Sequence, residues 1–142
     1  MTVQIREIRF PDDYPQVQNL WASMDKGVRL GRSDTPEEIQ KKLARDPDLF
    51  LVAEVDGQII GTVIGGYDGR RGLLYHLAVA ASFRGRGVGT RLMEEIEARL
   101  RSKGCRRCYL MVLADNDEAM RYYEKHGWEN MQHVLTYAKN LA

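Results

Sequence analysis

The stretch LAVAASFRGRGVGTRL, residues 77–92, joins an apolar run to a helix through a glycine-rich turn. The run that leads into it, residues 73–80, is apolar at most positions and predicts a strand buried on both faces, in the centre of a sheet. After the turn, apolar residues recur at intervals of four, which predicts an amphipathic helix over residues 87–103; they are Val88, Leu92, Ile96 and Leu100. The turn therefore lies where a central strand ends and a helix begins.

This turn has the composition of an anion-binding site. The first N–H groups of a helix have no intrahelical acceptor, and they carry a partial positive charge. Glycines lack a Cβ atom, so a phosphate could approach the backbone closely; they are Gly85, Gly87 and Gly89. Arg84 and Arg86 add charge beside them. The turn predicts a phosphate-binding backbone, although a glycine-rich loop with solvated arginines has the same composition.

The turn departs from both common nucleotide motifs. A nucleoside-triphosphate loop would continue with Lys-Ser/Thr after its last glycine, and here Gly89 is followed by Thr90 and Arg91. The dinucleotide fingerprint would need a glycine at position 90. The predicted anion therefore belongs to another class of ligand.

The remaining elements complete one α/β domain over residues 1–142. Strands are predicted at 3–9, 49–55, 58–67, 107–113 and 132–139. Helices are predicted at 11–24 and 115–126, and another begins at Thr35 and includes Ile39 and Leu43. The order is β-α-α-β-β-β-α-β-α-β. The β-α-β unit that contains the glycine-rich turn is expected to be right-handed, with its two strands parallel.

A second motif lies downstream and identifies a family. NDEAMRYYEKHGW, residues 116–128, resembles the second signature of the GNAT N-acetyltransferases, Asn-x-x-Ala-x-x-x-Tyr-x-x-x-Gly-Phe, with Trp128 in place of Phe. The turn at 84–89 resembles the acetyl-CoA signature of the same family, Arg/Gln-x-x-Gly-x-Gly/Ala after a strand. The segment 65–69 is similar to the small bacterial YpeA-type subgroup.

The resemblance implies a three-layer fold whose central mixed sheet splays between the two signature strands. It implies acetyl-CoA as co-substrate, no metal, and a primary amine that attacks the thioester directly. Tyr123 would act as general acid toward the departing thiolate. The implied cofactor-binding residues are Leu77, Ala78, Val79, Arg84, Gly85, Arg86, Gly87, Val88, Gly89, Thr90, Asn116 and Tyr123.

The sequence does not identify the general base. Strand alternation predicts Leu73, Tyr75, Leu77 and Val79 on one face and His76 on the other. Relatives carry their basic residue at the parity of residues 73 and 75, so His76 is expected to be a packing residue unless a bulge turns it. His76, Tyr75 and a water relay remain candidates, with Glu54 and Asp68 more remote. We expect an enzyme that depends on Tyr123 and has no single essential base.

The acceptor amine is not identified by the sequence. The architecture predicts a pocket opposite the cofactor, lined by Trp21, Arg29, Tyr67, Asp68 and Tyr75. Arg29 and Arg32 could bind a carboxylate or remain solvated. A small molecule, an amino acid and a protein amine are all compatible with these residues.

Charge and composition exclude several classes of function. The net charge of +1 gives no basic field for nucleic acid, no segment has the length of a membrane span, and no signal peptide begins the chain, so a cytoplasmic protein is expected. Cys105 and Cys108 are expected to be ordinary thiols, since no partners complete a metal or redox site.

Exposed strand edges are compatible with a homodimer. Two rivals remain, a non-catalytic acyl-CoA-binding module and a nucleotide-phosphate-binding protein of another fold.

Overall fold

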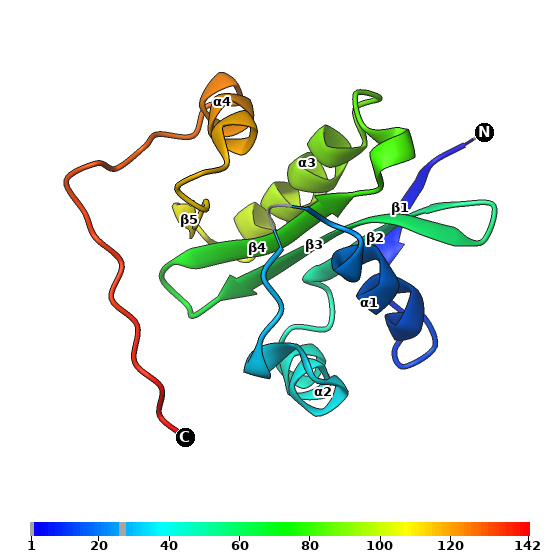
Figure 1. Ribbon diagram of the computed structural model, residues 1–142. Helices are drawn as coiled ribbons and strands as arrows, with labels where there is room; N and C mark the ends of the chain where they lie inside the picture. The colour runs from blue at the N-terminus through cyan, green and yellow to red at the C-terminus, as the bar shows by residue number, and fades with distance from the viewer. Residues whose placement is uncertain (1, 26–27) are drawn as a thin grey trace.

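The computed structural model describes residues 2–25 and 28–142. A five-stranded sheet has the order β1-β2-β3-β4-β5, formed by β1 (Gln4–Glu7), β2 (Phe50–Val55), β3 (Gln58–Tyr67), β4 (Gly72–Val79) and β5 (Cys108–Leu110). Neighbours are antiparallel except β4 and β5, which are parallel. The helices are α1 (Tyr14–Ala22), α2 (Pro36–Arg45), α3 (Val88–Ser102) and α4 (Asp117–Lys125), with short 3₁₀ turns η1 (Arg32–Asp34) and η2 (Ala81–Phe83) (Figure 1).

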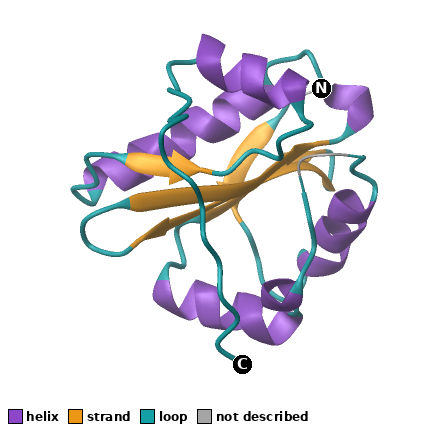
Figure 2. Ribbon diagram, turned by 60° about the vertical axis from the view of Figure 1, so that its left-hand side comes forward, coloured by secondary structure: helices purple, strands orange, loops and turns teal. Residues whose placement is uncertain are grey.

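Helices cover both faces of the sheet, as Figure 2 shows. On one face α3 buries its apolar stripe against β2, β3 and β4. Two glycines of β3 allow this close approach, because a Cβ atom at Gly61 would lie 3.0 Å from the Leu92 side chain, and one at Gly65 would lie 3.0 Å from Ile96. On the other face α1 and α2 enclose a second core around Trp21 and Phe50.

Local sequence explains where the helices begin. Thr35 accepts a hydrogen bond from the backbone N–H of Glu38 (3.3 Å) at the start of α2. Asn116 accepts one from Ala119 (3.1 Å) at the start of α4. At the start of α3 the capping residue is Gly87, whose φ of +81° lies in the left-handed region that favours glycine.

The predicted α/β class with a central mixed sheet is confirmed, and the order of elements agrees with the prediction from β1 to α4. The prediction of a final strand over residues 132–139 is wrong. These residues pair with no strand, and Figure 1 draws them in red as an extended chain beside the sheet. Leu135 and Tyr137 are 76% and 89% exposed. A strand forms only when a sheet edge pairs with its backbone, and β5, the last strand of the sheet, is just three residues long.

Across the part of the chain that the structure describes, none of the helices combines the length and the apolarity needed to cross a membrane.

Candidate active site

Strand β4 has one open edge along its second half. Strand β5 pairs only with Gly72, Leu73 and Leu74, so residues 75–79 have no strand partner on that side (Figure 1). On the other side, the Ala80 N–H donates to the Ile60 carbonyl (2.8 Å). Because polar groups alternate in an antiparallel ladder, the N–H and C=O groups of Leu77 and Val79 point away from β3, toward the open edge. The two parallel strands thus separate, as the sequence resemblance implied.

This open edge leads directly into the glycine-rich turn. Gly85 and Gly87 have φ values of +75° and +81°, and a Cβ atom at either position would meet no atom within 4 Å. The backbone N–H groups of residues 85–90 donate no hydrogen bond to any described residue, and the first bond of α3 runs from Arg91 to the Gly87 carbonyl (3.0 Å). The turn therefore presents a row of free donors at the positive end of a helix, which fits a pyrophosphate.

The two arginines are held by the turn itself. Arg84 donates from Nε to the Val79 carbonyl (3.2 Å), and one of its terminal nitrogens lies 3.8 Å from the Met24 sulfur. The guanidinium of Arg86 lies over the Phe83 ring, 5.2 Å from its centre. Both side chains remain exposed, so their charge is available to an anion at the turn.

Helix α4 supplies two adjacent tyrosines with different surroundings. The Tyr122 hydroxyl lies 3.0 Å from the Thr90 hydroxyl, at the first turn of α3. Tyr123 packs against the α3-side core and the Trp128 ring, with ring centres 6.1 Å apart. Burial, with a smaller contribution from Tyr122, raises the pKa of Tyr123 to about 12, so this phenol keeps its proton at neutral pH. Tyr122 contacts the glycine-rich turn, a role that spacing within the motif does not reveal.

A bulge in β4 overturns the predicted parity of this strand. The pairing with β3 shifts register between Thr62 and Ile64, and His76 has a φ of +54°. Tyr75 and His76 both lie on the α1/α2 face, whereas Leu77 and Val79 pack on the α3 face. The prediction that Tyr75 shares a face with Leu77 and Val79 is therefore wrong, because the alternation restarts after the bulge.

A chain of buried hydrogen bonds holds the bulge. The Trp21 indole N–H donates to the Thr62 hydroxyl (2.9 Å), and this hydroxyl donates to the His76 carbonyl (2.9 Å). Trp21 and Thr62 are fully buried, and the Trp21 ring meets the His76 ring edge-on at 4.7 Å. The bulge is therefore fixed by side chains from α1 and β3.

The imidazole of His76 is paired with an aspartate that the sequence did not single out. His76 Nε2 lies 2.8 Å from Asp34 Oδ1, and the two side chains are 14% and 10% exposed. Asp34 Oδ2 accepts from the Gly31 N–H (2.8 Å), and the Asp34 carbonyl accepts from the Tyr14 hydroxyl (2.5 Å). Asp34 and His76 are 42 positions apart, so only the folded chain brings them together.

The predicted acceptor residues divide into two groups. Trp21 and Tyr75 lie near the bulge, and Arg29 is exposed on the segment before η1. Tyr67 ends β3 opposite Gly72 and Asp68 lies in the β3–β4 turn, so both lie at the end of β4 that is far from the glycine-rich turn. Burial, then the charges of Asp46 and Asp34, raise the pKa of Tyr75 to about 12. Tyr75 is therefore no base at neutral pH.

A hollow lies beside the bulge, next to Trp21 and Asp34. Its volume is about 290 Å³, and it is lined by Tyr14, Gln18, Trp21, Leu30, Gly31, Asp34, Thr35 and Pro36. We call it the η1 hollow. Arg32, the other arginine considered for a carboxylate, contacts the backbone oxygen of Ala142.

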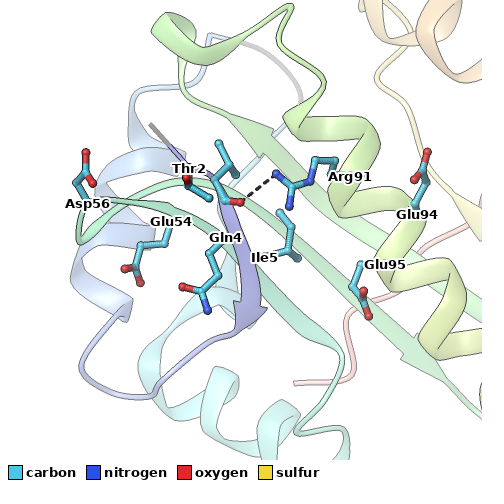
Figure 3. Close-up of a pocket in the computed structure, with 9 residues that line it drawn as sticks. Thr2, Gln4, Ile5, Glu54, Asp56, Arg91, Glu94 and Glu95 are labelled. Atoms are coloured by element: carbon cyan, nitrogen blue, oxygen red, sulfur yellow. Dashed lines mark hydrogen bonds between the residues drawn. The ribbon is translucent and has the colours of Figure 1, made fainter.

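The larger hollow in Figure 3 lies elsewhere, between β1, the β2–β3 hairpin and α3. It measures about 650 Å³ and is ringed by carboxylates, while Arg91 binds the Val3 carbonyl (3.0 Å). Glu54, at its wall, is paired with Arg6 at 2.6 Å. The other remote base candidate, Asp68, accepts the N–H groups of Arg70 and Arg71 and lies in neither hollow. Neither carboxylate reaches the open edge of β4.

The two thiols are structural. Cys105 is buried next to Gly72, and both cysteines are free. Burial, with a smaller contribution from Cys105, raises the pKa of Cys108 to about 11, which disfavours the reactive thiolate.

Comparison with known proteins identifies the family. A profile of the Acetyltransferase (GNAT) family matches residues 9–128. An acetyltransferase of Pectobacterium atrosepticum is 43% identical over 139 residues, which cover 98% of this chain and 96% of that protein. The chain belongs to the GNAT family of acetyltransferases.

Solved structures agree with this assignment. Ard1 from Thermoplasma volcanium superposes with a TM-score of 0.77 and is 29% identical, covering 89% of this chain and 82% of that one. PaiA N-acetyltransferase from Thermoplasma acidophilum, solved in complex with coenzyme A, gives a TM-score of 0.74 at 18% identity, covering 91% of each chain. Family membership supports acetyl transfer from acetyl-CoA as the general reaction.

Proposed function

We propose that this protein transfers the acetyl group of acetyl-CoA to a primary amine, which attacks the thioester directly. One observation carries the proposal. The unpaired edge of β4 at residues 75–79 runs into a turn whose free N–H groups, at residues 85–90, face no acceptor among the described residues. An extended arm ending in a pyrophosphate matches that pair of features, because the strand edge can pair with amides and the turn can bind the phosphates.

The chain's own groups can assist the chemistry. The outward-pointing N–H of Leu77 can donate to the carbonyl oxygen on which negative charge develops. Tyr123, protonated at neutral pH, can donate to the departing sulfur. Asn116 caps α4 through its side-chain oxygen and so fixes the helix that carries Tyr123.

The amine must lose a proton, and the cost depends on its class. Deprotonating a lysine side chain at pH 7 costs roughly 4–5 kcal/mol, whereas an α-amine costs about 1 kcal/mol. The η1 hollow, at about 290 Å³, suits a compact primary amine. We propose this class of acceptor, with no metal in the reaction.

Two measurements test the proposal. Calorimetry should show acetyl-CoA binding more tightly than ATP, since the turn lacks the lysine of a triphosphate site. Thiol release should then depend on the amine in a panel that spans α-amines, polyamines and lysyl peptides. Tight binding with no turnover on any amine would favour the non-catalytic acyl-CoA-binding module, and tighter ATP binding would contradict the proposal altogether.

A further inference from the structure

The α1/α2 face of β4 carries a histidine whose two ring nitrogens differ. Nε2 is bound to Asp34 at 2.8 Å, while Nδ1 has no hydrogen-bond partner among the described residues. A carboxylate that accepts from one ring nitrogen fixes the tautomer and leaves a lone pair on the other nitrogen. His76 is therefore held as an oriented proton acceptor.

The aspartate is itself fixed from two directions. The Gly31 N–H binds its second carboxylate oxygen, and the Tyr14 hydroxyl binds its backbone carbonyl. Its side chain is only 10% exposed, so water competes little for the imidazole. A packing histidine needs no such support, because a single backbone acceptor would satisfy its N–H.

The backbone conformation of His76 also determines where its ring lies. The φ of +54° belongs to a region that non-glycine residues occupy at a cost, and here it directs Tyr75 and His76 to the same face. The Trp21–Thr62 chain holds that conformation. Regular alternation would direct Tyr75 and His76 to opposite faces, so only the bulge lets both residues lie on the face of the η1 hollow.

The position is suited to proton transfer at the open edge. His76 immediately precedes Leu77, whose N–H faces the open edge, and its partner Asp34 lines the η1 hollow. The titratable groups around the ring are Asp34 from η1, Tyr75 from β4 and, through the Asp34 carbonyl, Tyr14 from α1. Asp46, near Tyr75, is neutralised by Lys42 at 2.7 Å.

We infer that His76 is the general base that deprotonates the acceptor amine, and that Asp34 is the residue that positions it. The inference rests on the proposed acetyl transfer, and it departs from the expectation of an enzyme with no single essential base. The acceptor, as an ammonium ion, first loses one proton to His76 Nδ1, and His76 later releases it to solvent. The free amine nitrogen then forms a bond to the thioester carbon, and the C–S bond breaks with its electron pair on sulfur. Tyr123 donates its proton to the sulfur, and the second proton lost by the nitrogen restores the Tyr123 phenol through solvent.

Variants at the two positions test the inference through kinetics. His76→Asn suits the positive φ and should lower kcat by on the order of 100-fold, with little change in acetyl-CoA binding by calorimetry. His76→Gly should regain activity when imidazole is added. Asp34→Asn, which keeps the shape and loses the charge, should lower kcat by about 10-fold or more and leave the KM for acetyl-CoA unchanged.

A spectroscopic measurement tests the geometry without turnover. The Nε2–H proton of His76 should give a downfield, exchange-protected NMR signal, absent in Asp34→Ala. His133→Asn, in the exposed tail, is the matched control and should change neither readout.

The outcomes separate the two proposals. If the wild type turns over and His76→Asn retains its rate within about threefold, the base assignment is wrong while acetyl transfer stands. If the wild type binds acetyl-CoA but acetylates no amine, the proposed function fails. In that case, a protonated Nδ1 at neutral pH would still contradict the inferred geometry.

Discussion

The two faces of the central sheet are packed with different kinds of side chain. The α3 face is packed almost entirely with apolar side chains. The α1/α2 face contains the buried polar side chains found among the described residues, namely Asp13, Asp46 and Thr62. The apolar face orients a helix whose first turn presents free backbone N–H groups. The polar face orients polar side chains instead. Proton transfer requires side chains of this kind in fixed positions. The cofactor site and the acceptor site therefore place different demands on the sequence.

The largest effect is expected at Thr62, which links the two halves of the polar face. Thr62→Val keeps the shape but leaves the Trp21 N–H and the His76 carbonyl without partners. We expect a loss of about 2–4 kcal/mol in the free energy of unfolding, measured by urea denaturation, because each unsatisfied buried group costs about 1–3 kcal/mol.

The matched change on the apolar face is Val63→Thr, which introduces a hydroxyl in the α3-side core. It should destabilise the fold without affecting the bulge. The kcat of the two variants is compared under conditions in which equal fractions of each are folded. Equal losses of kcat would show that the hydrogen bonds from Trp21 through Thr62 to His76 have no special part in positioning His76.

The next largest effect concerns Tyr123. Tyr123→Phe should lower kcat by about 10- to 100-fold, a modest loss because a thiolate with a pKa of about 8.5 leaves with little help. Since burial, and to a lesser extent Tyr122, raise the pKa of Tyr123 to about 12, the donor form is present throughout the working range and is lost only as pH rises through that value. The kcat profile should therefore show no basic limb from this group below pH of about 10.

Tyr122→Phe is the control for that variant. It removes the 3.0 Å contact with Thr90 and should raise the KM for acetyl-CoA more than it lowers kcat. A larger loss of kcat for Tyr122 than for Tyr123 would reverse the two roles.

A smaller effect is expected in the glycine-rich turn. Gly87→Ala forces a side chain into φ +81° and should cost about 1–2 kcal/mol of stability, with acetyl-CoA binding weakened about 10-fold by calorimetry. Gly31→Ala is the control, since its backbone is extended and a Cβ atom there would meet nothing within 4 Å. If both substitutions are neutral, the left-handed turn does not govern affinity.

The smallest effect concerns acid sensitivity of the polar face. Burial would raise the pKa of Asp13, but hydrogen bonds from Arg6 and the Arg9 N–H outweigh it, and the net pKa is lowered. Asp13 therefore stabilises the fold above its ordinary pKa of 3.8, and this contribution is lost as pH falls through the lower folded value. Asp13→Asn should cost about 1 kcal/mol at pH 7, a gap that closes below pH of about 4. If the difference in stability between the wild type and Asp13→Asn persists in acid, it arises from packing and not from the charge of Asp13.

The sequence predicted the two faces unequally, for a physical reason. The donor row at residues 85–90 depends on neighbouring residues alone, so a strand, three glycines and a helix start were enough to predict it. His76 and Asp34 meet across 42 positions, and the bulge that brings them together reverses the alternation on which a strand prediction relies. Local pattern could not reveal a partner that distant. The prediction of a final strand failed for a related reason, because residues 132–139 pair with no strand in the structure, and local sequence cannot show whether a partner edge exists.

The Trp21–Thr62–His76 chain has an optical consequence. The sequence contains two tryptophans, and the structure puts one on each side of the chemistry, with Trp21 4.7 Å from the His76 ring and Trp128 6.1 Å from Tyr123. Trp128→Phe leaves a single fluorophore in contact with the imidazole, and Trp21→Phe leaves one beside the phenol. Indole emission depends on the surroundings of the ring, so the first variant would report events around His76, while the second would report events around Tyr123. The molecule thus contains one fluorescent side chain beside the proposed base and another beside the proposed acid.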